Sequence, residues 1–251
     1  MIKRERQHHI LEIVKERKYC TVNFLSKQLF VAPITVRRDL LEMEAAGMIA
    51  RCYGGATIPE HENREVPFEV RNKSHFSVKD KIAEKAAKLI KRGDVIFLDA
   101  SSTDSHILKY LSAEQNVTVI TNSTFVAEKL KDKHIRCYLT GGMSVENSYA
   151  LVGSIAEQTV TDLYANVCFF SAQGIDEDGV ISDQSEAESA LRRLMIQNAQ
   201  KQYFLFDGSK YHKRFAFKIG NARDITNVIT DLSHVSFKTD DRAHLGVETV
   251  S

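Results

Sequence analysis

Five short polar segments follow runs of apolar residues, and their side chains are of the types that bind a phosphorylated sugar. Hydroxyl groups, glycine N–H groups and a lysine suit a phosphate, whereas Asp and Asn side chains suit sugar hydroxyls. In a parallel α/β sheet, the loops that follow the strands gather ligand-binding groups at one edge. Each segment alone is also typical of an ordinary turn, because Gly, Asp, Asn and Ser dominate turns. The candidate ligand-binding residues are Asp99, Ser101, Ser102, Thr103, Thr121, Asn122, Gly141, Gly142, Gln173, Gly174, Asp176, Asp207 and Lys210.

Motifs for nucleotides and metals do not accompany these segments. Neither the Rossmann pattern G-x-G-x-x-G nor the P-loop pattern G-x-x-x-x-G-K-[ST] occurs in the sequence. Cys20, Cys52, Cys137 and Cys168 lie far apart and form no C-x-x-C pair, so we expect reduced, buried thiols. We therefore expect no cofactor, no metal site and no catalytic cysteine.

The distribution of charge separates the first part of the chain from the rest. Residues 1–57 carry ten basic and six acidic residues, a net charge of +4, and the remainder carries −3. A small basic segment on a weakly acidic body is typical of a polyanion-binding module joined to another domain. No apolar run approaches the ~20 residues that span a bilayer. The polar N-terminus lacks the apolar core of a signal peptide, so we expect a cytoplasmic protein.

The basic segment predicts three helices followed by a hairpin. Residues 2–17 form the first amphipathic pattern, and Thr21 can cap a second short helix. Pro33 suits the first turn of a third helix, which Gly47 ends. Residues 48–57 predict two short strands with a glycine pair at their turn. Two short helices, a tight turn and a hairpin indicate a winged helix-turn-helix domain.

The third helix presents side chains that suit DNA. Val36, Leu40 and Met43 recur at spacings of four and three and face inward, so Arg37 and Arg38 face outward. Arginine bonds guanine in the major groove, and helix N-termini favour phosphate oxygens. The alternative is an ordinary solvated helix face, on which acidic neighbours pair with the two arginines. The candidate DNA-binding residues are Pro33, Ile34, Thr35, Arg37, Arg38, Arg51, Tyr53 and Gly54, the last three on the hairpin.

Short apolar strands alternate with helices in the remainder of the chain. Strands are expected at 95–98, 117–120, 136–139, 167–170 and 203–206, with helices near 79–91, 104–111, 124–131, 153–163 and 185–200. This alternation predicts an α/β domain with a mostly parallel sheet that is covered on both faces. Residues 58–75 contain two of the three prolines and little to bury, so they predict a linker between domains at 1–57 and 76–251.

Two runs of residues resemble the N-terminal signature of the DeoR family of bacterial repressors. They are Val31-Ala32-Pro33-Ile34-Thr35-Val36-Arg37-Arg38-Asp39-Leu40 and Gly47-Met48-Ile49-Ala50-Arg51-Cys52-Tyr53-Gly54-Gly55-Ala56. The resemblance implies that the winged helix-turn-helix binds double-stranded operator DNA. Ala32 stands where the family usually has Ser. If that Ser is the N-cap, its loss costs about 1 kcal/mol of local helix stability.

The later segments resemble the sugar-phosphate sensor domain of the same family. The matching features are Lys81-Ile82-Ala83, Asp99-Ala100, Thr103, Thr121-Asn122-Ser123, Gly141-Gly142, Gly153, Gly174-Ile175-Asp176, Asp207, Ser209-Lys210 and Thr230-Asp231. The family's first loop usually has Gly where this chain has Ser101, which adds a Cβ and a hydroxyl near the expected ligand. The resemblance implies a fold similar to that of ribose-5-phosphate isomerases and CoA transferases. It also implies a phosphorylated sugar as effector and a homo-oligomer, either a dimer or a tetramer.

We therefore expect a repressor of a carbohydrate-metabolism operon that a phosphorylated sugar or sugar-derived effector releases from its operator, and we expect no enzyme activity. An activator with the same DNA-binding domain is one alternative, because the sign of regulation depends on where the operator lies. A sugar-phosphate isomerase is another, with Asp176, Glu186 and Lys210 as its acid–base and electrophilic groups. The segment after Asp176 lacks the Lys- and Gly-rich loop of those isomerases, which disfavours this alternative.

Overall fold

The chain divides into two units, Met1–Val70 and Arg71–Ser251, and each unit has its own hydrophobic core. The computed structural model describes residues 2–17, 19–52, 54–57, 66–146, 148–235, 237 and 246–250. Among them, no helix is both long and apolar enough to cross a membrane.

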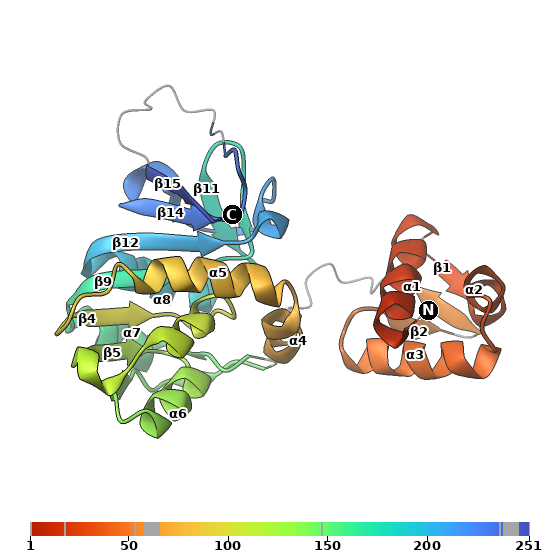
Figure 1. Ribbon diagram of the computed structural model, residues 1–251, viewed down its shortest axis with the longest axis horizontal. Helices are drawn as coiled ribbons and strands as arrows, with labels where there is room; N and C mark the ends of the chain where they lie inside the picture. Colours follow the sequence, from red (N-terminus) through yellow and green to blue (C-terminus); the bar gives the residue numbers. More distant parts are fainter. Residues whose placement is uncertain are drawn as a thin grey trace. The chain divides into compact units, whose positions relative to one another are not determined.

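The first unit is a winged helix-turn-helix, as predicted (Figure 1). Its elements are α1 (Lys3–Arg17), β1 (Tyr19–Thr21), α2 (Val22–Leu29), α3 (Pro33–Ala45), β2 (Ala50–Cys52) and β3 (Gly55–Thr57). Strand β1 was not predicted, and it pairs with β3 so that the sheet order is β1-β3-β2. Gly55 allows this pairing, because a Cβ at that position would lie 2.2 Å from the carbonyl oxygen of Cys20.

Local backbone chemistry sets the ends of the two central helices. The Thr21 hydroxyl accepts a hydrogen bond from the Phe24 N–H at 3.1 Å and so caps α2, as predicted. Helix α2 ends at Phe30, whose φ of +53° lies in the left-handed region. Helix α3 ends at Ala45 with Ala46 as its C-cap; Gly47 follows with a φ of +69°, and the N–H of Met48 bonds back to Met43 O at 2.9 Å. This is the helix stop that the sequence predicts.

The second unit is built on a seven-stranded sheet of order β15-β14-β12-β9-β4-β5-β6, and every neighbouring pair in it is parallel. Its strands are β4 (Val95–Leu98), β5 (Thr118–Thr121), β6 (Arg136–Leu139), β9 (Ala165–Phe170), β12 (Ala199–Phe206), β14 (Asn227–Thr230) and β15 (Gly246–Thr249). The five predicted strands are confirmed. The sequence did not predict β14 and β15, nor two small antiparallel sheets made of β7 (Met143–Ser144), β8 (Leu151–Val152), β10 (Gly174–Ile175), β11 (Val180–Asp183) and β13 (Phe217–Asn221).

Helices cover both faces of this sheet, and alternate residues of each strand face opposite cores. Ile96 and Leu98 of β4 join the core under α5 (Phe76–Ala87) and α6 (Thr124–Asp132). Phe97, between them, joins the core under α7 (Ser154–Thr161) and α8 (Glu186–Gln197). The strands are therefore apolar on both faces, as a covered parallel sheet requires. The connections form short 3-10 helices at η1 (Asp104–Tyr110), η2 (Ala113–Gln115), η3 (Gly208–Lys210) and η4 (Ala222–Asp224), so the helix predicted near 104–111 is a 3-10 helix.

Part of the segment predicted as a linker is helical. Residues 58–65 lie outside the described part of the chain, but Phe68–Lys73 form helix α4. Phe68 is fully buried and packs this helix against the protein. The prediction of a linker relied on the two prolines and did not take Phe68 into account. The boundary between the two units, after Val70, falls within α4. The domain limits of 1–57 and 76–251 stay predictions.

Candidate functional sites

Helix α3 presents two arginines to solvent because its opposite face is fixed in the core. Val36, Leu40 and Met43 are buried, and Arg37 and Arg38 are exposed. The predicted orientation of this helix is therefore confirmed. Contact of the arginines with DNA stays a prediction.

A buried ion pair between α1 and α3 helps to fix this orientation. Asp39 is 1% exposed and accepts hydrogen bonds from Arg6 Nε at 2.5 Å and from Arg6 Nη2 at 3.1 Å. The hydrogen bond with Asp39 raises the pKa of Arg6, which keeps the guanidinium charged. Glu42 pairs with Lys3 at 2.5 Å and lies 3.8 Å from Arg38 Nε. Asp39 therefore faces away from the outer arginines, and the exposed pair of Glu42 with Arg38 is a weak interaction that solvent screens.

An open groove of about 700 Å³ lies along α3 and the beginning of α1. Ile34 on its wall is 69% exposed, an unusual position for a large aliphatic side chain. In a major groove, such a side chain contacts the methyl group of thymine. Lys3 and Leu41 also line the groove, although sequence reasoning did not single them out. The lining residues are Lys3, Arg6, Ile34, Thr35, Arg37, Arg38, Asp39, Leu41 and Glu42.

The other predicted DNA-binding residues lie at the start of α3 and on the hairpin. Pro33 is exposed at the first position of α3, and Thr35, the third residue of the helix, is half-buried and lines the groove. Arg51 is exposed on β2, where it pairs with Glu44 of α3 at 3.5 Å, and Gly54 is exposed with φ of +78°. Tyr53 lies outside the described residues.

In the second unit, a narrow pocket lies where three neighbouring strands of the large sheet end. Its walls come from the loops after β4, β9 and β12, together with residues of α4, α8 and β11. Five predicted residues line it, namely Ser101, Ser102, Thr103, Gln173 and Lys210. The other lining residues, which the sequence reasoning missed, are Arg71, Ser171, Ala172, Asp183 and Arg192. The enclosed space is about 10 Å³, about what one water molecule needs, so a larger ligand must displace side chains.

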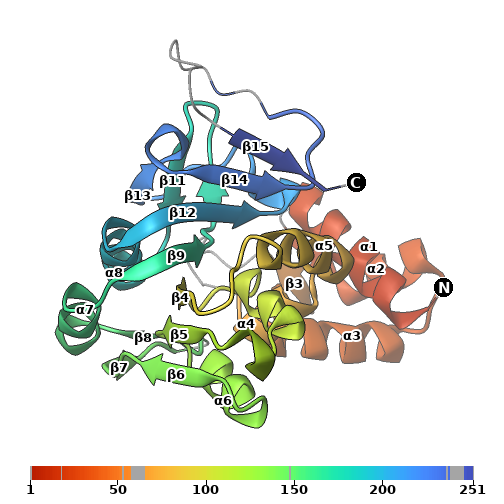
Figure 2. The ribbon, with the colours of Figure 1, turned by 60° about the vertical axis from the view of Figure 1, so that its left-hand side comes forward.

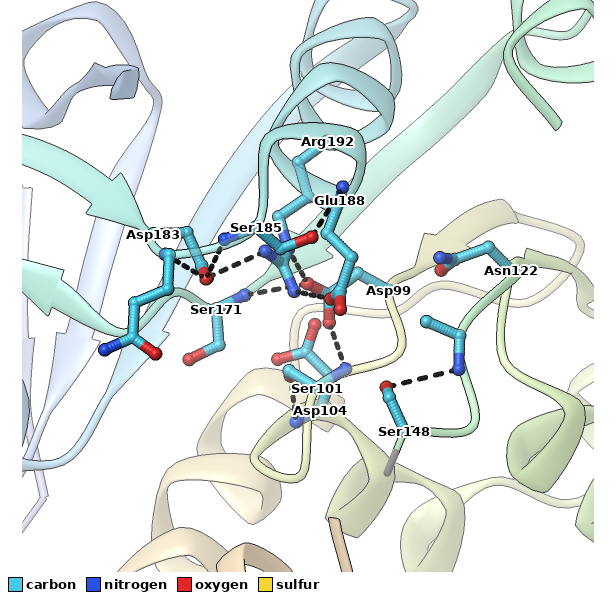
Figure 3. A network of polar contacts seen from close by, with 12 residues as sticks. Asp99, Ser101, Asp104, Asn122, Ser148, Ser171, Asp183, Ser185, Glu188 and Arg192 are labelled. Carbon is cyan, nitrogen blue, oxygen red and sulfur yellow. Dashed lines mark hydrogen bonds and ion pairs between the residues drawn. The ribbon is translucent and has the colours of Figure 1, made fainter. Parts of the chain in front are cut away.

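A buried charge network holds the floor of this pocket (Figure 3). The guanidinium of Arg192 is 5% exposed and bonds Asp99 at 2.6 Å, Asp183 at 2.8 Å and Glu188 at 2.8 Å. Asp99 also accepts a hydrogen bond from the N–H of Ser101 at 2.7 Å. The network therefore joins the loop after β4 to β11 and α8, and it fixes the pocket wall. Asp99, predicted as a ligand-binding residue, lies beneath the lining and positions it.

Asp104 adds a second carboxyl beside this network. Its side chain is fully buried, and Figure 3 shows it next to Asp99 and Ser101. Burial, followed by the negative charge of Asp99, raises the pKa of Asp104 well above its usual range. Because the single cation of Arg192 already faces three carboxylates, the protonated form of Asp104 is favoured there more than that of an exposed aspartate.

Cationic side chains converge beside the pocket. Lys79 of α5 is 3% exposed, and its ammonium donates to Ser102 Oγ at 3.0 Å and to the carbonyl oxygen of Arg71. Burial, together with the charges of nearby Lys210 and Arg71, lowers the pKa of Lys79 to about 8, although the negative charge of Asp207 opposes this shift. Burial likewise lowers the pKa of Lys210. An added anion would relieve this concentration of positive charge.

The structure places several predicted ligand-binding residues away from the pocket lining. Thr121 is the last residue of β5, Asn122 follows it, and Gly141 and Gly142 follow β6, so these residues lie one and two strands beyond β4. Asn122 donates instead to Leu151 O at 3.1 Å.

Two other predicted residues lie in or just after β10, Gly174 in the strand and Asp176 in the turn that follows it, and a third, Asp207, lies beside the pocket. Asp176 forms an ion pair with Arg214 and accepts the N–H of Val180 at 3.0 Å. Gly174 packs tightly against the backbone of Lys213. Asp207 caps η3 by accepting the N–H of Ser209 at 3.0 Å.

Comparison with known proteins identifies both units. The DeoR-like helix-turn-helix domain matches residues 6–62, and the DeoR C terminal sensor domain matches residues 74–232. The chain belongs to the DeoR family. A DeoR-family regulator uses the first unit to bind DNA, and the chain is a DNA-binding transcriptional regulator.

Relatives of this DeoR-family chain match it along most of their length. The uncharacterized HTH-type transcriptional regulator YulB of Bacillus subtilis is 35% identical, over 92% of this chain and 90% of its own. The HTH-type transcriptional repressor GlcR of the same organism is 33% identical, over 92% and 89%. The L-fucose operon activator of Escherichia coli is 30% identical, over 94% and 98%. Among solved structures, ribose 5-phosphate isomerase A of Methanocaldococcus jannaschii gives a TM-score of 0.42 at 19% identity, over 55% of each chain.

The two departures from the DeoR pattern have local consequences. Ala32 is the N-cap residue of α3 and provides no side-chain hydrogen bond, so the cap contact is missing, as expected. Ser101 places its hydroxyl within its own loop, where it accepts the N–H of Asp104 at 3.1 Å. The added hydroxyl therefore closes the turn at the pocket wall.

Proposed function

We propose that this chain represses a carbohydrate-metabolism operon and that a phosphorylated sugar releases it from operator DNA. The proposal rests chiefly on Arg71 and Lys210, which line a pocket together with three hydroxyl-bearing residues of one loop, and on Lys79 beside it. A phosphate is the anion that this combination of cations and hydroxyls suits best. The named repressor among the relatives supports the sign of regulation.

Release would follow from competition for the ammonium of Lys79. That ammonium donates to the carbonyl oxygen of Arg71, which lies in α4, the helix that holds the boundary between the two units. A phosphate that attracts Lys79 and the side chain of Arg71 would weaken this hold on α4. Two states of α4 are then in equilibrium, one with and one without the hydrogen bond from Lys79. The ligand shifts this equilibrium only to the extent that its affinities for the two states differ.

DNA binding by two copies completes the proposal. A homo-oligomer would place two α3 helices in successive major grooves of a repeated or palindromic site. Arg37, Arg38 and Ile34 would face the bases there, and Arg51 would contact a backbone phosphate.

The DNA-binding half is tested with a fragment that the purified chain selects from random sequence. We expect Arg38→Ala to weaken binding by roughly 1–3 kcal/mol in fluorescence anisotropy, because a base-reading arginine contributes that much. Lys15→Ala, an exposed cation near the other end of α1, is the matched control. Equal affinities of the two variants would remove Arg38 from the interface.

The effector half is tested by thermal unfolding in the presence of triose, pentose and hexose phosphates. A ligand that binds only the native state stabilises it by RT ln(1 + [L]/Kd), so the melting temperature rises with the ratio of ligand concentration to Kd. We expect Lys210→Ala to bind the selected DNA normally and to lose both the thermal shift and the release. Lys213→Ala, an exposed lysine three residues away, should keep both. Normal release from Lys210→Ala would show that the pocket is not the effector site.

Activation instead of repression is a second candidate, favoured by the similarity to the L-fucose operon activator. The same α3 and pocket would serve both, since only the position of the operator differs. A reporter driven by the natural promoter decides between them. Deleting the gene for this chain raises reporter expression if the chain represses and lowers it if the chain activates.

A further inference from the structure

One margin of the large sheet exposes four large apolar side chains, here called the β6 patch: Tyr138 and Leu139, on opposite faces of β6, together with Met143 and Ile155. Their exposed fractions lie between 42% and 70%. Ile155 lies over the loop that joins the other three, with its Cγ2 3.6 Å from the place a Cβ on Gly141 would take. These four side chains present on the order of 400 Å² of surface, within the ~300–600 Å² of the largest apolar patch on a typical monomer.

Strand β6 is also the outer strand of its sheet. It pairs with β5 on one side and ends the strand order among the residues that the structure describes (Figure 2). Proteins usually protect such an edge with charged residues, proline or a bulge. Strand β6 begins with the exposed Arg136, but from Cys137 to Val145 the chain has neither a charged residue nor a proline. The backbone edge and the β6 patch are therefore open to another chain together.

The chemistry of the patch fits a second copy of this chain. In a two-fold interface each residue meets the same surface of its partner, so a charged patch would repel itself and an apolar one would not. A standard interface buries about 800 Å² per partner, so the β6 patch would supply about half of it, as an apolar centre. An outer strand paired antiparallel with its own copy would also satisfy the open backbone groups of both strands.

We propose that the β6 patch is the surface through which two copies of this chain associate. The inference rests on the homo-oligomer proposed above and assigns it a surface. The apolar side chains of each copy cover those of the other. Each dimer then carries two winged helix-turn-helix units, which makes its affinity for a two-half-site operator exceed that of one unit alone.

The test is sedimentation velocity of the full chain over a range of concentrations, with parent and variants side by side. Met143→Glu and Ile155→Lys each bring two like charges together across the proposed two-fold axis. We expect either change to weaken self-association at least 100-fold, with unchanged circular dichroism because both side chains are exposed. Tyr164→Glu is the matched control, since Tyr164 is 77% exposed but lies beyond the other end of α7, and it should associate like the parent.

Binding to DNA separates failure of this inference from failure of the proposed function. We expect Met143→Glu to keep the parent's affinity for a single half-site and to lose at least 10-fold on the two-half-site fragment. A parent chain that sediments as a monomer, or a dimer that resists both charged variants, overturns the assignment of the β6 patch. A dimer that the variants dissociate, but that selects no DNA, overturns the regulatory function and leaves the patch assignment intact.

Discussion

Replacing Arg192 by methionine tests the buried network that holds the ligand pocket. The side chain is 5% exposed, and its three nitrogens bond three different carboxylates at 2.6–2.8 Å. Methionine keeps most of the apolar stem and removes the charge. Breaking a buried ion pair from one side costs 3–5 kcal/mol, because the partner charges remain without compensation. We expect Arg192→Met to lower the free energy of unfolding of the second unit by at least that amount at pH 7.5.

The pH dependence of this loss follows from proton uptake. Without the cation, the folded state can relieve the repulsion of its carboxylates only by binding protons. Burial and the charge of Asp99 raise the pKa of Asp104, and the charge of Arg192 lowers it; losing Arg192 therefore raises this pKa further, so the stability of the variant rises as the pH falls. The difference from the parent should therefore be largest near neutral pH and clearly smaller at pH 5.

Urea unfolding followed by circular dichroism at both pH values measures this effect. Arg193→Met is the matched control, because Arg193 is the next residue of α8 and bonds only the carbonyl oxygen of Lys218. We expect the control to cost about 1 kcal/mol and to lack the pH dependence. Equal losses from Arg192→Met and Arg193→Met, or a loss independent of pH, would refute the account of the network.

Three further predictions concern single positions. Phe30→Asn should stabilise the first unit by about 1 kcal/mol in thermal unfolding, because Phe30 is 95% exposed and has a φ that Asn tolerates better; no gain would exclude backbone strain there. Gly55→Ala should destabilise the same unit by roughly 1–3 kcal/mol and reduce DNA binding, since its Cβ would collide with the backbone of Cys20; unchanged unfolding would contradict the packing of β1 on β3. Effector affinity in calorimetry should fall as the pH rises through about 8, where Lys79 loses its charge, and Lys79→Met should bind weakly at every pH; a flat profile for the parent would exclude Lys79 from the phosphate contact.

Sequence patterns predicted the elements whose burial is regular. The spacing of Val36, Leu40 and Met43 predicted which face of α3 is buried. The parallel strands could be recognised as apolar runs because both faces of the sheet are covered. The three residues of β1 carry no such pattern, and their pairing depends on a close approach to Gly55 that only the tertiary structure reveals. Strand β14 and the small antiparallel sheets are short and mixed in composition, so periodicity could not identify them.

The ligand pocket was only partly predictable, because strand order decides which loops meet. Chain order does not reveal that β12, β9 and β4 are neighbours while β6 lies two strands beyond β4. Arg192 and Lys79 were missed because they lie on helices and not in the polar loops. A signal for both exists, since each occupies the apolar face of its helix. Lys79 precedes Ile82, Ala83 and Ala86 at spacings of three, four and seven, and a buried charge at such a position indicates a specific partner.

The DNA-binding surface and the ligand pocket have one feature in common. In each, a buried ion pair positions a segment that lies next to a functional cation, Arg38 in the first unit and Lys79 in the second. Asp39 holds Arg6, and the adjacent Arg38 is left outside; Asp99 holds Arg192, and the adjoining loop presents Ser102 to Lys79. Buried ion pairs contribute little net stability compared with apolar packing, because desolvation offsets the attraction. Here they fix the orientation of the helices. The two hydrogen bonds of Arg6 with Asp39 resist rotation of α3 about its axis, whereas leucine packing does not. On this argument, replacing Arg6 and Asp39 together by apolar residues should preserve the fold of the first unit and still lose DNA binding.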